Sequence, residues 1–147
     1  MEKKIQAERM ADLTFELLEH CQVKREKMAE MLHLTVAEFK LIRGFRGSET
    51  LSVNELAKRV ELSSSRLTRI IDGLVAKGLV RREIGLRDRR VMEISLTPKG
   101  KKIEAELEEM YVKTHLDILS LLPPGADDSV ILAMEKLRDA MKEWVKK

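Results

Sequence analysis

The sequence is poor in the residues that build disulfide-stabilised, sheet-rich or membrane-spanning proteins. One of its 147 residues is cysteine, so no disulfide can close within the chain, which favours a reducing cytoplasm. Aromatic residues make up 3%, with seven glycines and three prolines, too few for a fold rich in strands and tight turns. No apolar run approaches the roughly 18 residues of a membrane span, and the N-terminus lacks the apolar core of a signal peptide. We therefore expect a cytoplasmic protein that does not associate with membranes, folded as one domain or as a unit completed by a partner.

Charged residues, in contrast, make up 36% of the chain, well above the usual quarter. The net charge is only +3, but residues 58–102 hold 13 Lys and Arg against 5 Asp and Glu, a local charge of +8. The remaining residues carry a net charge of −5. A basic segment in an acidic frame indicates either a polyanionic partner for that segment or simply a solvated charged surface.

Apolar periodicity predicts long amphipathic helices at both ends of the chain. Residues 4–32 carry one apolar stripe at helical spacing, and a short helix should follow Thr35, a candidate N-cap with Glu38 three residues later. A long helix is predicted from Pro98 to about residue 122, and a last helix should begin at a cap formed by Asp127 and Asp128. The stripe of the first helix consists of Met10, Leu13, Leu17, Cys21, Met28 and Met31.

The middle of the chain predicts two short helices joined by a tight turn. Ser52 and Glu55 form a capping box for the first helix, and Ser63 or Ser64 should cap the second. The apolar spacing of the second helix leaves a polar face that contains Ser65, Arg66, Thr68, Arg69 and Asp72. This pattern is typical of a helix-turn-helix, although many helical domains contain such a corner by chance.

Two short strands and a basic turn follow the helix pair. Residues 79–84 and 91–96 read as strands, and Met92, Ile94 and Leu96 should alternate inward in the second of them. The turn between the strands contains Gly85 and four consecutive charged residues, Arg87, Asp88, Arg89 and Arg90. A helix-turn-helix followed by a basic-tipped hairpin is a winged helix, and these arginines lie at the tip of the predicted wing.

The segments "LTVAEFKLI", "LSVNELAKRVELSSSRLTRIIDGLVAKGLV" and "DRRVMEISLTPKG" resemble, in order and spacing, the MarR family of winged-helix transcription regulators. The resemblance covers nearly the whole chain. It implies a mainly α fold with a small β-hairpin, in which residues 35–97 form the DNA-binding winged helix-turn-helix. Residues 1–34 and 98–147 would form the helical dimerisation region, so that two chains make a single intertwined unit.

The resemblance also assigns residues to DNA. Ser64, Ser65, Arg66, Thr68 and Arg69 would lie on the recognition helix, at the major groove. Asp88 and Arg90 match the D-x-R pair of the family's wing, in which the aspartate steadies an arginine that enters the minor groove; Arg87 and Arg89 would extend this cationic tip. The chain departs from the family where Gly85-Leu86-Arg87 replaces the usual acidic residue and proline.

The function implied is a homodimeric, sequence-specific regulator of transcription, a repressor relieved by a small, often aromatic, ligand. Its partners would be double-stranded DNA carrying an inverted-repeat operator and a second copy of the chain. One alternative is a redox or metal sensor of the same fold, using Cys21 or the scattered His20, His33 and His115. Another is a winged-helix docking module that does not bind DNA. No nucleophile, phosphate-loop or zinc-protease motif occurs, so we expect no enzyme activity, cofactor or metal site.

Overall fold

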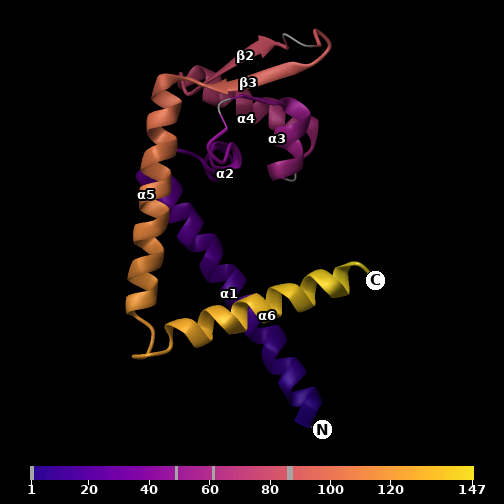
Figure 1. Cartoon of the computed structure of the whole chain (residues 1–147), viewed down its shortest axis with the longest axis vertical. Helices are drawn as coiled ribbons and strands as arrows, with labels where there is room; N and C mark the ends of the chain where they lie inside the picture. The colour runs from indigo at the N-terminus through magenta and orange to yellow at the C-terminus, as the bar shows by residue number, and fades with distance from the viewer. Residues whose placement is uncertain (1, 49, 61, 86–87) are drawn as a thin grey trace. The chain divides into compact units, whose positions relative to one another are not determined.

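The computed structural model describes residues 2–48, 50–60, 62–85 and 88–147. Within these ranges, the helices and strands follow one another as a mostly helical chain with one small sheet (Figure 1). They are α1 (Glu2–Met31), α2 (Val36–Gly44), β1 (Thr50–Ser52), α3 (Val53–Val60), α4 (Ser64–Ala76), β2 (Val80–Ile84), β3 (Met92–Leu96), α5 (Pro98–Ser120) and α6 (Asp127–Val145).

Local capping explains where the first two helices end and begin. His33 adopts a positive φ of 57° after α1, and the Leu34 amide donates to the Ala29 carbonyl at 3.0 Å, the arrangement that closes many helix C-termini. The predicted capping box at α2 is confirmed: Thr35 Oγ1 accepts from the Glu38 amide at 3.1 Å, and Glu38 Oε1 accepts from the Thr35 amide at 2.9 Å. The chain therefore turns sharply between α1 and α2.

The predicted helix-turn-helix is formed by α3 and α4. Ser52 Oγ accepts from the Glu55 amide at 3.1 Å and caps α3, while Ser63 is the N-cap of α4. The helix α4 buries Leu67, Ile71 and Leu74 completely or nearly so. Its opposite side is left to solvent.

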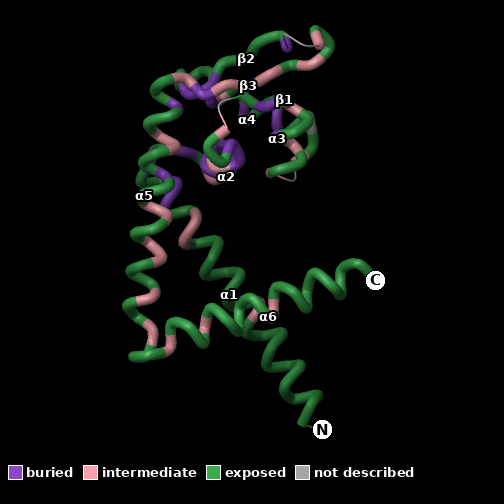
Figure 2. Tube along the Cα trace, viewed as in Figure 1, coloured by how far each residue is buried: buried purple, intermediate pink, exposed green. Residues whose placement is uncertain are grey.

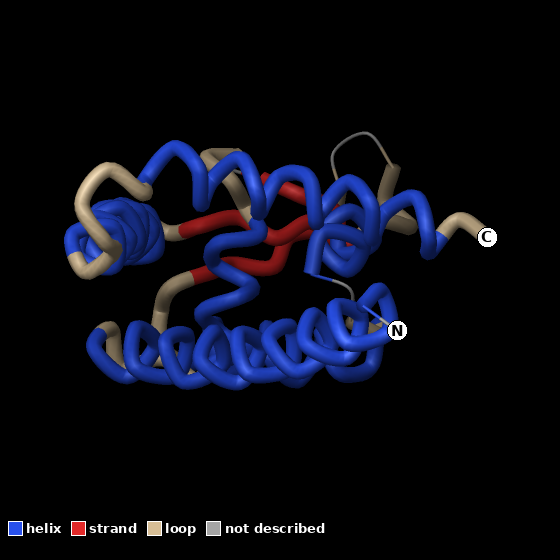
Figure 3. Tube along the Cα trace, turned by 90° about the horizontal axis from the view of Figure 1, so that it is seen from below, coloured by secondary structure: helices blue, strands red, loops and turns tan. Residues whose placement is uncertain are grey.

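The strands, drawn red in Figure 3, form a single sheet. It contains three antiparallel strands in the order β1-β3-β2. The predicted hairpin pairs Arg82 with Ile94, and Thr50 of β1 adds to the far side of β3 opposite Ser95. The sequence analysis missed β1 because its three residues are too few to show an alternating pattern. Met92 was expected to point inward, but its side chain is 41% exposed, since β3 extends at that end beyond the core and into the wing.

Burial is concentrated in residues 1–108, which form one of two compact units (Figure 2). Completely buried side chains from α2 and the Phe45 that follows it, and from α3, α4, β3 and α5, make this core. They are Phe39, Leu41, Ile42, Phe45, Leu56, Leu67, Leu74, Ile94 and Leu107. In the second unit, residues 109–147, no residue is buried.

Most of the predicted stripe on α1 is also exposed, Met28 being its only buried member. The predicted cap of α6 was wrong: Asp127 is the first residue of the helix, and Ala126 precedes it without a side-chain cap.

Candidate nucleic-acid interface

The outer face of α4 presents polar and cationic side chains. Ser65, Arg66, Thr68 and Arg69 are all exposed, because the apolar residues of the helix turn to the core at three- and four-residue spacing. Ser64 begins the helix, but its side chain lies outside the described part of the structure. The other four residues that the sequence analysis assigned to the DNA-facing side of this helix therefore share one accessible face.

At the tip of the wing, Asp88 and Arg90 form an ion pair with three hydrogen bonds. Arg90 Nε donates to Asp88 Oδ1 and Arg90 Nη2 to Asp88 Oδ2, both at 3.1 Å, and the Arg90 amide donates to Oδ1 at 3.0 Å. The hydrogen bonds from Arg90 hold the pKa of Asp88 below its ordinary value, because they favour the charged carboxylate. The Arg90 side chain is nonetheless 90% exposed, so the pair orients this arginine without burying it.

Glycine is required at the base of the same turn. The Gly85 amide donates to the Val91 carbonyl at 2.8 Å. A Cβ atom at Gly85 would lie 2.7 Å from the Asp88 carbonyl oxygen, which is shorter than real Cβ contacts are. Arg89 beside this turn is exposed; Arg87 lies outside the described residues.

A second ion pair joins the wing to α4. Arg82 of β2 donates to Asp72, whose side chain is on the polar side of α4. The sequence does not predict this pair, because the two residues lie ten positions apart on different elements and no periodic pattern relates them. The Arg82 side chain therefore has a partner within the protein.

The wing and α4 also border one hollow of about 400 Å³. Thr68 comes from α4, Arg82 and Met92 from the wing strands, and Arg90 from the wing tip. The helix α4 and the wing therefore meet on one side of the first unit, as contact of both with one double-stranded polyanion requires.

The residues considered for sensing are dispersed. Cys21 is exposed on α1, and among the described residues no three His, Cys, Asp or Glu side chains gather in a way that could hold a metal ion. Within the same ranges, no helix combines the length and apolar character needed to cross a membrane.

Comparison with known proteins gives consistent matches. The family model described as "MarR family" matches residues 34–92. The HTH-type transcriptional repressor MdtR of Bacillus subtilis (strain 168) is 31% identical over 94 residues, which cover 62% of this chain and 61% of the relative.

Solved structures share the fold over most of their length. The crystal structure of the YusO protein from Bacillus subtilis matches with a TM-score of 0.71 and 26% identity, covering 89% of this chain and 95% of that chain. Wild-type MarR from E. coli in its apo form matches with a TM-score of 0.69 and 24% identity, covering 83% of this chain and 94% of that one. In its winged helix, in its three-stranded sheet and in its sequence over residues 34–92, the chain is similar to the MarR family of winged-helix transcription regulators.

Proposed function

We propose that this chain is a homodimer that binds an inverted-repeat DNA site and represses transcription from it. The observation that carries the proposal is the placement of Arg90: it is oriented by Asp88, exposed, and on the same side of the first unit as the polar face of α4. A planar, weakly hydrated guanidinium suits a narrow, electronegative minor groove. The exposed Ser65, Arg66, Thr68 and Arg69 of α4 suit base edges and phosphates in the major groove.

Unpartnered apolar side chains on the terminal helices support a dimer of this chain. A single copy leaves apolar residues of α1 and α6 open to water, a cost that association removes. The exposed residues include Ile5, Met10, Phe15, Leu17 and Leu18 on α1, and Leu132, Met134, Met141, Trp144 and Val145 on α6. We assign residues 1–34 and 98–147 to dimerisation and residues 35–97 to DNA binding, the two regions forming one intertwined unit.

Repression and its relief by a small ligand complete the proposal. The matched protein MdtR is named a transcriptional repressor, and repression is the simplest result of occupying a promoter. The hollow beside the wing is lined by apolar Ile71 and Met92 and by the cationic residues Arg82 and Arg90, a chemistry that suits an aromatic anion. Such a ligand there would compete with phosphates for Arg90.

The test is selection of bound fragments from random-sequence DNA, followed by sedimentation of the free protein. We expect an inverted repeat whose half-sites are about one helical turn apart, since two α4 helices related by a two-fold axis read successive major grooves. We also expect a dimer at micromolar concentration. An optimal site with a single half-site, or a folded monomer, would contradict the proposal. Compounds that release the selected duplex would then identify the ligand class.

The alternative of a docking module predicts an apolar outer face on α4. Ser65, Arg66 and Arg69 make this face polar and cationic instead, which favours a nucleic acid over an apolar protein surface.

A further inference from the structure

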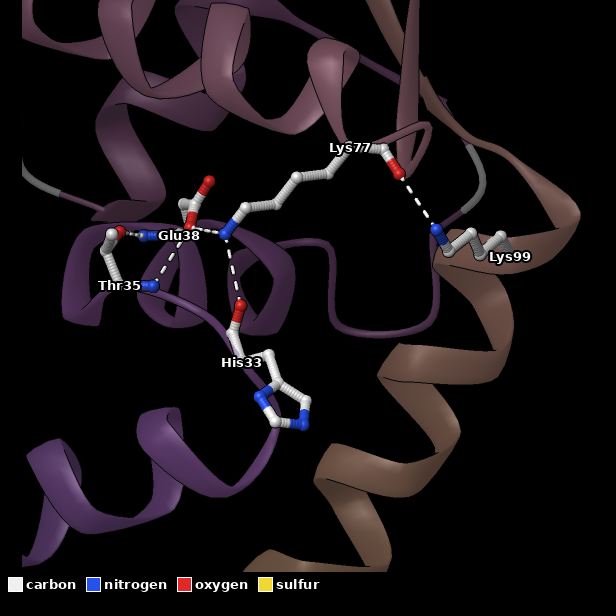
Figure 4. Close-up of polar contacts among 5 residues, drawn as sticks. All are labelled: His33, Thr35, Glu38, Lys77 and Lys99. Carbon is white, nitrogen blue, oxygen red and sulfur yellow. Dashed lines mark hydrogen bonds and ion pairs between the residues drawn. The ribbon is translucent and has the colours of Figure 1, made fainter.

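Polar contacts from two other elements hold the C-terminal end of α4 (Figure 4). Lys77 directly follows α4 as its C-cap residue. Its ammonium group donates to Glu38 Oε1 of α2 at 2.6 Å and to the His33 carbonyl, in the turn between α1 and α2, at 3.1 Å. A single side chain thereby ties the end of α4 to the corner between α1 and α2.

The start of α5 holds the same end of α4 from the other side. The Lys99 ammonium donates to the Lys77 carbonyl at 3.1 Å, and the Thr97 hydroxyl donates to the Gly78 carbonyl at 2.6 Å. The last carbonyls of a helix have no partner within the helix, and cations near them also interact favourably with the helix dipole. We call these contacts of Glu38, Lys77, Thr97 and Lys99 the α4 anchor.

Within the α4 anchor, Glu38 is held in place by burial and by a further hydrogen bond. Its side chain is only 6% exposed, and the capping box of α2 holds the same Oε1 atom through the Thr35 amide at 2.9 Å. A buried carboxylate is stable only when charge and hydrogen bonds compensate the lost water. α4 passes close to this group: a Cβ atom at Gly73 would lie 3.1 Å from Glu38 Oε2.

We propose that Glu38 and Lys77 are positioning residues for DNA recognition: their ion pair fixes the direction of α4, and thereby places side chains that do not touch the pair. The proposal rests on the proposed function of the α4 face. Twelve residues separate Lys77 from Ser65, about 18 Å along a helix. At that distance, a tilt of α4 by about 5° moves its N-terminal end by about 1.5 Å, which is enough to break a hydrogen bond to a base.

The experiment compares two dissociation constants for each variant at one salt concentration. One is for the duplex that the wild-type chain selects from random-sequence DNA, and the other is for an unrelated duplex of equal length. Their ratio does not depend on the fraction of folded protein, so a variant that merely loses stability keeps it. Circular dichroism monitors the fold.

Glu38→Gln removes the negative charge and keeps a hydrogen-bonding side chain. By charge alone it should bind every duplex more tightly, since it adds one unit of net positive charge. We expect instead that the preference for the selected duplex falls about tenfold, the contribution of about one good base contact. Glu108→Gln is the matched control: it makes the same charge change in an exposed pair with Arg43 of α2 (3.4 Å), away from α4, and should keep the wild-type preference.

Lys77→Met is the second variant: it keeps Glu38 and its capping box with Thr35 and changes instead the side chain of Lys77, which is 41% exposed. This substitution lowers the net charge by one unit, whereas Glu38→Gln raises it. The preference for the selected duplex should nevertheless again fall about tenfold. The double variant should lose no more than either single one, because both remove the same contact. A preference that remains at the wild-type value in both single variants overturns this proposal alone. A wild-type chain that prefers no duplex overturns the proposed function and this inference with it.

Discussion

Asp88 is an acid on a surface that we propose meets phosphates. A carboxylate there repels DNA, and the structure shows what offsets this: all three hydrogen bonds between Asp88 and Arg90 direct the arginine while leaving its side chain 90% exposed. A flexible arginine would lose its side-chain freedom on entering a groove. The pair arranges the guanidinium before DNA arrives.

Arg90→Ala should weaken binding to the selected duplex by about 1–3 kcal/mol per subunit, most strongly where the flanks are rich in A·T. Asp88→Ala should also weaken binding, although it removes a negative charge, because Arg90 loses its orientation. Fluorescence anisotropy with labelled duplexes measures both variants. Tighter binding of Asp88→Ala to every duplex would show that the wing acts only as a cationic patch.

The pH dependence of stability should reveal the Glu38–Lys77 pair. Burial by itself raises the pKa of Glu38, but the hydrogen bonds and charge of Lys77, together with the hydrogen bonds of Thr35, bring it below the ordinary value of 4.5. A lowered pKa in the folded state contributes stability that is present above 4.5 and is lost as the pH falls through the folded value. Urea unfolding should therefore show a steeper loss for the wild type than for Glu38→Gln below about pH 4.5. Parallel curves in that range would contradict the pairing.

At the scale of elements, the start of α5 packs closely against the segment that follows α4. Thr97 caps α5 through the Gly100 amide at 3.0 Å and donates its own amide to the Leu79 carbonyl at 3.0 Å. A Cβ atom at Gly100 would lie 2.0 Å from the Leu79 carbonyl oxygen. Only glycine permits α5 to begin this close to the segment that follows α4.

Gly100→Ala should therefore destabilise the protein by at least about 2 kcal/mol, because the clash involves backbone that cannot rotate away. Helix propensity alone predicts the opposite sign, a gain of about 1 kcal/mol. Lys102→Ala, two residues further on and exposed, is the control and should change the free energy of unfolding by less than about 0.5 kcal/mol. Chemical denaturation measures both; a stable Gly100→Ala variant would mean that this junction is not tight.

At the scale of the whole molecule, charge is unevenly distributed along the chain. The segment of residues 58–102, with a net charge of +8, contains α4, which we propose as the recognition helix, and the wing. The rest of the chain, at −5, contains α1, α6 and most of α5, the helices that we assign to dimerisation. A dimer of this kind would bring two basic segments to one duplex.

Binding to the selected duplex should therefore weaken steeply with salt. With roughly 6–10 phosphate contacts per dimer, affinity should drop about 10³–10⁵-fold between 50 and 200 mM salt. Titrations at several salt concentrations give the slope. A flat response would favour the docking-module alternative over a DNA-binding surface.

The sequence by itself determined the helices, the helix-turn-helix and the wing. Their signals are local: the caps at Thr35, Ser63 and Thr97 act over three residues, and apolar spacing identifies the buried side of α4. Only the tertiary structure decided that Thr50 extends the sheet beside Ser95, that Arg82 meets Asp72, and that Glu38 is buried against Lys77. These contacts join residues 10 to 45 positions apart in the chain. Glu38 shows the difference well, since the sequence marks it as a capping residue, whereas its second partner exists only because packing brings the end of α4 to the start of α2.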